Sequence, residues 1–125
     1  MNKTIVLVED DKILSDMYQL KFEKAGFTVA SFNDGKKTLE WLKSHTADIA
    51  LIDILLPQMN GLQLIKTIRI NPSYSAMKII ILTNLSQSDV NLHETVRESL
   101  KVDAYYVKSQ ISPSQLVAHI TALLQ

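Results

Sequence analysis

Short runs of β-branched and other apolar residues alternate along the chain with longer segments in which apolar residues recur every three or four positions. The short runs are typical of strands buried on both faces, and the longer segments are typical of amphipathic helices. The predicted strands cover residues 4–8, 28–32, 49–52, 78–82 and 104–107. The predicted helices cover residues 12–25, 35–44, 61–70, 89–100 and 113–124. This alternation predicts an α/β fold in which a parallel sheet is covered on both faces, within one domain over residues 1–125.

Two helix boundaries carry a specific chemical signal. Gly26 follows the first predicted helix, where a left-handed C-terminal cap favours glycine. The last helix begins with Ser112 as the cap and Pro113 in the first turn, and Gln115 is placed to return the capping hydrogen bond. These signals fix the order of the elements.

Composition and charge exclude several functional classes. The chain has 13 Lys and Arg against 13 Asp and Glu, and the adjacent pair Lys36 and Lys37 is too small a basic patch to follow a phosphate backbone. There is no cysteine, no apolar run long enough to span a membrane, and no N-terminal signal sequence. We therefore expect a cytoplasmic protein that binds neither nucleic acid nor membranes.

Polar side chains stand where the predicted strands end: Glu9, Asp10, Asp53, Thr83 and Lys108. In an open α/β sheet the carboxyl ends of the strands face one crevice, so these residues converge. Two carboxylates about 5 Å apart repel by roughly 3 kcal/mol at an effective dielectric constant of about 20. The cluster therefore needs a bound cation or a proton, and an all-oxygen ligand set favours Mg²⁺.

A lysine and a hydroxyl beside a metal site form a phosphate-sized set of contacts. Lys108 supplies a positive charge facing the acidic group, and Thr83 supplies a hydroxyl that can donate to a phosphoryl oxygen. The combination indicates phosphoryl transfer.

Four stretches of the chain resemble the receiver domain of two-component response regulators, in that family's order and at roughly its spacing. They are Val8-Glu9-Asp10-Asp11, Leu51-Ile52-Asp53-Ile54-Leu55-Leu56-Pro57 with Gly61, Ile81-Leu82-Thr83, and Tyr105-Tyr106-Val107-Lys108. The resemblance implies a flavodoxin-like, doubly wound sheet of five parallel strands in the order 2-1-3-4-5 with five helices. It also implies a signalling switch rather than an enzyme.

The resemblance assigns roles to the predicted site residues. Asp53 resembles the phosphoacceptor, which takes its phosphoryl group from a histidine kinase, a phosphotransfer protein or a small phosphodonor. Glu9, Asp10, Asp53 and the backbone carbonyl of Leu55 resemble the ligands of Mg²⁺, with Mn²⁺ as an alternative ion. Lys108 resembles the lysine that holds the phosphoryl group.

The remaining roles concern the response to phosphorylation. Thr83 resembles the hydroxyl that moves toward the phosphoryl group, and Tyr105 resembles the aromatic switch that turns inward when Thr83 moves. The resemblance places the output on the face of helix four, strand five and helix five, which binds a downstream protein or forms a phosphorylation-dependent dimer of an otherwise monomeric protein.

The chain departs from the family pattern at four neighbouring positions. Ser109 follows Lys108 where the family usually has proline, and Asn84 replaces a small residue. Leu55 and Leu85 are apolar where they would border the phosphoryl group, so we expect them to exclude water and prolong its lifetime.

Two other interpretations remain open at this stage. A haloacid-dehalogenase-like phosphohydrolase also combines aspartate, threonine, lysine and Mg²⁺, but its nucleophile lies in an Asp-x-Asp motif after the first strand. A receiver-like interaction module that is never phosphorylated is the second alternative. The sequence also leaves open whether the receiver acts alone or with an effector domain.

Overall fold

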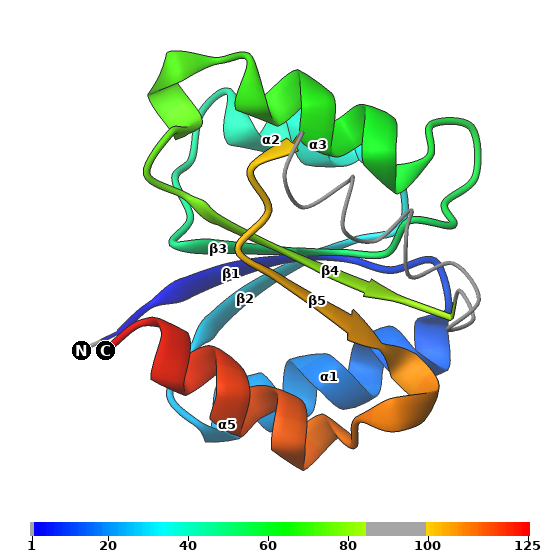
Figure 1. Ribbon diagram of the computed structural model, residues 1–125, viewed down its shortest axis with the longest axis vertical. Helices are drawn as coiled ribbons and strands as arrows, with labels where there is room; N and C mark the ends of the chain where they lie inside the picture. The colour runs from blue at the N-terminus through cyan, green and yellow to red at the C-terminus, as the bar shows by residue number, and fades with distance from the viewer. Residues whose placement is uncertain (1, 85–99) are drawn as a thin grey trace.

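A five-stranded parallel sheet forms the centre of the protein (Figure 1). The computed structural model describes residues 2–84 and 100–125. The strands are β1 (Thr4–Val8), β2 (Thr28–Phe32), β3 (Ile49–Ile52), β4 (Lys78–Thr83) and β5 (Ala104–Val107). Their order is β2-β1-β3-β4-β5, as expected. The predicted strand limits are confirmed, except that β4 continues by one residue to include Thr83.

The described residues contain four α-helices, which cover both faces of the sheet. They are α1 (Lys12–Lys24), α2 (Gly35–Leu42), α3 (Gly61–Arg69) and α5 (Pro113–Leu123). Figure 1 shows α1 and α5 on one face and α2 and α3 on the other. Each helix ends one or two residues earlier than predicted. The predicted helix at residues 89–100 falls almost entirely outside the described part of the chain.

The described residues also contain two 3₁₀ turns that were not predicted, η1 (Pro72–Tyr74) and η3 (Lys108–Gln110). Each has only three residues, too few to show a periodic pattern in the sequence. Where the structure describes the chain, no helix combines the length and apolar character needed to cross a membrane.

Two hydrophobic cores hold the layers together. Every residue of β3 is buried, which explains why its sequence is uninterrupted by polar residues. Side chains on one face of the sheet pack against Leu64, Ile65 and Ile68 of α3. Those on the other face pack against the α1 and α5 residues Tyr18, Phe22, Leu116 and Ile120.

The two capping signals read from the sequence are confirmed in atomic detail. Gly26 has a φ of 98°, and beyond it the Phe27 N–H donates to the Phe22 carbonyl at 3.0 Å. The two phenylalanine rings meet edge to face with centroids 5.5 Å apart. At α5, the Ser112 hydroxyl accepts from the Gln115 N–H at 3.1 Å, and the Gln115 side chain accepts from the Ser112 N–H at 2.9 Å.

The strand register brings the first and third strand ends together. Val8 lies beside Phe32 on one side and Ile52 on the other. The pairing extends one step further, because the Asp53 N–H donates to the Val8 carbonyl at 3.0 Å, and the Glu9 N–H donates to the Phe32 carbonyl at the same distance. Glu9 and Asp53 are therefore fixed as neighbours by backbone hydrogen bonds.

Candidate functional site

Lys108 connects the two buried carboxylates at the edge of the sheet. Its Nζ donates to Glu9 Oε1 at 2.5 Å and to Asp53 Oδ2 at 2.7 Å. The exposed side-chain fractions are 8% for Lys108, 2% for Glu9 and 6% for Asp53, so little water screens this contact. The lysine was expected to face the acidic group, and it lies in direct contact with two of the carboxylates, where it offsets part of their repulsion.

Asp10 completes an acidic group that can hold a metal ion. Glu9, Asp10 and Asp53 each place one carboxylate oxygen so that the three oxygens lie within 4.8 Å of one another. Asp10 is exposed, so the group is open to solvent on its side. Asp11 has a structural role, because its side chain caps α1 by accepting from the Leu14 N–H at 3.1 Å.

Burial changes the protonation of this cluster. Desolvation raises the pKa of Glu9 from 4.5 to about 7, although the hydrogen bond and charge of Lys108 oppose the change. Burial also disfavours the ammonium of Lys108, but its hydrogen bonds and charge interactions with Asp53 and Glu9 outweigh this and raise its pKa. Near neutral pH, Lys108 is therefore charged, and Glu9 is present in both its protonated and its ionised form.

The loop between β3 and α3 places Asp53 through short-range hydrogen bonds. The Leu55 N–H donates to Asp53 Oδ1 at 3.0 Å, and the Gly61 N–H donates to the Ile54 carbonyl at 2.7 Å. Within the described residues, the Leu55 carbonyl accepts no hydrogen bond, so its oxygen is available as the predicted ligand. The Leu55 side chain is 56% exposed beside the site. Gln58 has a φ of 66°, which is uncommon outside glycine and marks a tightly turned loop.

Gly61 permits the closest backbone approach at the site. A Cβ atom at this position would lie 2.2 Å from the Asp53 carbonyl oxygen and 2.7 Å from the Ile54 Cα. We expect Gly61→Ala to displace the backbone of Asp53, lower the free energy of unfolding by about 1–3 kcal/mol and slow any reaction at that residue. Chemical denaturation and phosphoryl uptake measure the two effects.

Gly35→Ala is the matched control for this prediction. A Cβ atom there would meet the Met59 Sδ at 2.8 Å, which is part of a flexible side chain that can move away. We expect a smaller loss of stability and unchanged uptake. Equal effects of the two substitutions would contradict the special role of Gly61.

The two predicted switch residues lie on the neighbouring strands β4 and β5 but at different depths. Thr83 is fully buried as the last residue of β4 and pairs in register with Val107. Tyr105 is half-buried and packs against the α2 and α3 side of the core, whereas Tyr106 packs on the opposite side. The two tyrosines therefore face opposite sides of the sheet. The peptide bond between Lys108 and Ser109 is trans.

Two positions where the chain departs from the family pattern lie at or beyond the limit of the described residues. Leu85 falls in the undescribed segment, and Asn84 is exposed at its border. The sequence prediction also missed the polar residues that line a groove beside the cluster, among them Ser31 in β2, Asn33 just after it and Lys37 in α2. Of these three, only Asn33 follows a strand end directly, so the rule that located Glu9 and Asp53 would not have found the groove.

Comparison with known proteins assigns the family. Residues 5–121 match the profile of the response regulator receiver domain. The chain is 34% identical over 123 residues to the transcriptional regulatory protein CseB of Streptomyces coelicolor, covering 97% of this chain and 49% of CseB. It is 32% identical to the transcriptional regulatory protein GltR of Pseudomonas aeruginosa, covering 98% of this chain and 49% of GltR. The chain thus spans about half the length of these relatives.

Solved structures agree with the fold. A putative response regulator from Chloroflexus aurantiacus superposes with a TM-score of 0.86 at 26% identity, covering 99% of this chain and 98% of that one. The chemotaxis response regulator CheY4 of Vibrio cholerae, at 20% identity, superposes with a TM-score of 0.87 over 98% of this chain and 99% of its own. With the profile match over nearly the whole sequence, these results place the chain in the response regulator receiver domain family, whose members are signalling modules rather than catalytic enzymes.

Proposed function

We propose that the protein accepts a phosphoryl group on Asp53 in a Mg²⁺-dependent reaction. The donor is the phosphohistidine of a sensor histidine kinase, a phosphotransfer protein or a small phosphodonor. The observation that carries the proposal is the contact of Lys108 with both Asp53 and Glu9 beside the exposed carboxylate of Asp10. This arrangement combines a nucleophile, a cation and an acidic metal-binding group at one strand edge.

The residues present fit a hard divalent ion. Glu9, Asp10 and Asp53 would hold Mg²⁺ through carboxylate oxygens, and the Leu55 carbonyl would add a neutral oxygen ligand. The ion would neutralise charge that develops on the transferring phosphoryl oxygens. The described residues of the cluster include no cysteine or histidine, which favours Mg²⁺ or Mn²⁺ over a softer metal.

Asp53 and Lys108 would carry out the transfer itself. A carboxylate oxygen of Asp53 forms the new bond to phosphorus while the donor bond breaks. The ammonium of Lys108 already lies 2.7 Å from Asp53 Oδ2, so it can follow the phosphoryl group with little movement. Glu9 shares this ammonium and would keep it oriented.

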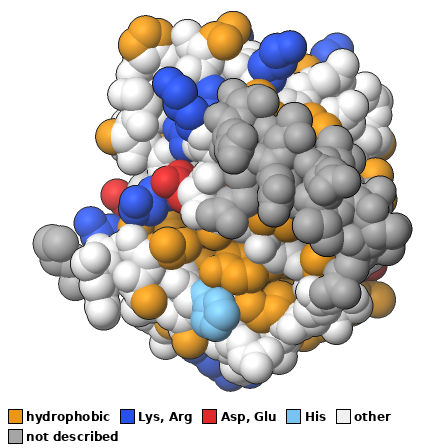
Figure 2. All heavy atoms as spheres, viewed as in Figure 1, with side chains coloured by type: hydrophobic (Ala, Val, Ile, Leu, Met, Phe, Trp, Pro, Cys, Tyr) orange, Lys and Arg blue, Asp and Glu red, His pale blue; other side chains and the backbone are white. Residues whose placement is uncertain are grey.

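Phosphorylation would alter Thr83, Tyr105 and the face beyond them. The phosphoryl group adds about −1.5 to −2 charges and new acceptor oxygens, for which the Thr83 hydroxyl is a donor. Movement of Thr83 would free space for Tyr105 and change binding at the face of β5 and α5. Figure 2 shows hydrophobic side chains gathered on this side of the molecule. Here the rings of Tyr106 in β5 and His119 in α5 meet with their centroids 5.5 Å apart. A downstream protein or a second phosphorylated copy would bind there.

The direct test is adduct formation by the wild-type protein. The protein is incubated with acetyl phosphate or beryllofluoride, with Mg²⁺ or with a chelator, and followed by intact mass and NMR. We expect one adduct that requires Mg²⁺. An unchanged spectrum and mass would favour an interaction module that is never phosphorylated, and steady turnover of phosphate esters would favour a phosphohydrolase.

Metal affinity should depend on pH through Glu9. Its pKa of about 7 predicts that Mg²⁺ binds with proton release below pH 7, so affinity rises up to about tenfold per pH unit there and levels off above pH 8. Glu9→Gln should bind Mg²⁺ more weakly and lose this dependence. Calorimetric titration of both proteins between pH 6 and about 9 measures the slopes, and an equal slope in Glu9→Gln would contradict the assignment.

The proton on Glu9 also affects the stability of the metal-free protein, which falls as the pH rises, whereas the affinity for Mg²⁺ increases. Because the folded pKa of Glu9 lies above its ordinary value of 4.5, its contribution to stability is complete below pH 4.5 and is lost as the pH rises through about 7. Mg²⁺ therefore stabilises the fold most where the metal-free protein is weakest.

Leu55 should influence the lifetime of the phosphoryl group. Its exposed, apolar side chain borders Asp53 and offers no hydrogen bond to an attacking water. We expect Leu55→Asn to shorten the half-life of the phosphorylated protein severalfold, measured by loss of label after the donor is removed. Ile70→Asn, which replaces another exposed apolar residue at the end of α3, is the control. Equal half-lives of wild type and Leu55→Asn would contradict this role.

A further inference from the structure

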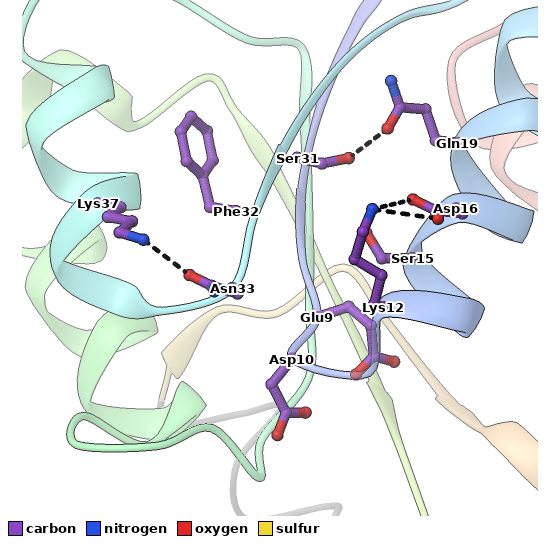
Figure 3. Close-up of a pocket in the computed structure, with 10 residues that line it drawn as sticks. All are labelled: Glu9, Asp10, Lys12, Ser15, Asp16, Gln19, Ser31, Phe32, Asn33 and Lys37. Carbon is purple, nitrogen blue, oxygen red and sulfur yellow. Dashed lines mark hydrogen bonds and ion pairs between the residues drawn. The ribbon is translucent and has the colours of Figure 1, made fainter.

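A polar groove opens beside the acidic cluster, between α1 and the end of β2 (Figure 3). Its volume is about 360 Å³, and Phe32 is its one apolar lining residue. Glu9 and Asp10 belong both to the groove and to the acidic cluster. Figure 3 shows the α1 side chains on one wall and Asn33 and Lys37 on the other. A small molecule bound at the cluster can therefore extend into this groove.

The two lysines of the groove differ in how their charge is balanced. Lys12 forms an ion pair with Asp16 at 3.1 Å. Lys37 donates to the neutral amide oxygen of Asn33 at 3.3 Å and forms no ion pair within residues 2–84 and 100–125. Its positive charge is therefore available to an anion.

The side-chain amide of Asn33 adds a donor beside Lys37. Its oxygen accepts from Lys37, so its amide nitrogen remains to donate. On this wall of the groove, the ammonium and the amide nitrogen suit a small carboxylate better than a cationic group.

We propose that this groove receives the carboxylate leaving group of acyl phosphates, an inference that rests on the proposed phosphorylation of Asp53. In the step, an Asp53 oxygen bonds to phosphorus while the bond from phosphorus to the acyl oxygen breaks. The departing carboxylate keeps the bonding electron pair, and its negative charge is stabilised by Lys37. No proton, oxidant or reductant is required.

The groove would then distinguish donors by their leaving groups. Acetyl phosphate releases an anion, whereas phosphoramidate releases ammonia, which gains nothing from Lys37. Beryllofluoride has no leaving group and tests the cluster alone. Comparing these three probes therefore distinguishes an effect of the groove on the leaving group from an effect on the phosphorylation site itself.

The experiment compares Lys37→Gln with Lys36→Gln in the full chain. Lys36 is the adjacent lysine, is exposed and does not line the groove, so its substitution removes the same charge. We expect Lys37→Gln to lower the second-order rate constant for acetyl phosphate about two- to fivefold, the range for an exposed charge contact, and to leave phosphoramidate and beryllofluoride unaffected. Lys37→Arg should retain the wild-type rate.

Three results would overturn the inference while the proposed function stands: no effect of Lys37→Gln, an equal effect of Lys36→Gln, or an equal loss with phosphoramidate. Each would show that Lys37 does not act on the leaving group. Failure of wild type to form the beryllofluoride adduct would instead overturn the proposed function.

Discussion

Asp53→Asn should abolish both phosphoryl uptake and the Mg²⁺-dependent beryllofluoride adduct. The amide is neutral and is a far weaker nucleophile than the carboxylate, yet its oxygen can still accept the hydrogen bond that the Leu55 N–H donates at 3.0 Å. The loop should therefore keep its shape while the chemistry is lost. Intact mass after incubation with acetyl phosphate gives the yield, and far-UV circular dichroism checks the fold.

Glu40→Gln is the matched control for this substitution. It also removes one negative charge, but from an exposed ion pair with Lys43 on α2. Wild-type uptake is expected for this variant. Phosphorylation of Asp53→Asn at the wild-type yield would place the phosphoacceptor elsewhere.

Lys108→Ala should have the largest effect on stability. The substitution leaves Glu9 and Asp53 buried side by side without their shared cation, and breaking such a contact costs about 3–5 kcal/mol. We expect the loss in urea denaturation at pH 8, and a smaller loss at pH 5, where Glu9 is protonated. Phosphoryl uptake should fall at both pH values.

Two further variants test the cause of that loss. Lys108→Arg keeps the charge and should retain most of the stability. Adding Glu9→Gln to Lys108→Ala removes one of the repelling carboxylates and should recover part of it, which a double-mutant cycle quantifies. A loss in Lys108→Ala that is independent of pH and of Glu9 would indicate packing rather than charge.

The sequence predicted the sheet well because its central strands β1, β3 and β4 are buried on both faces. Residues 5–8 of β1 and all of β3 are buried and apolar, so these strands are visible as uninterrupted runs. Thr83 was placed just beyond β4 because its side chain is polar. The residue is nevertheless fully buried, and it belongs to the strand because its pairing with Val107 continues the ladder of β4 and β5.

The site was predicted in outline but not in its internal contacts. Strand ends located Glu9, Asp53 and Lys108, because topology alone decides which ends share an edge. The sequence could not show that Lys108 reaches both carboxylates, since that depends on the path of η3 and on side-chain rotamers. The groove beside Lys37 was missed for a similar reason, because its walls come from three separate elements.

The position of Lys108 also bears on what the site responds to. Because the Lys108 ammonium joins Glu9 to Asp53, the protein itself holds these two carboxylates together. Metal binding would then require little rearrangement of the chain. A change in the concentration of the cation would alter how many molecules hold the metal but would leave the conformation of the protein unchanged. A change of conformation would then report phosphorylation alone.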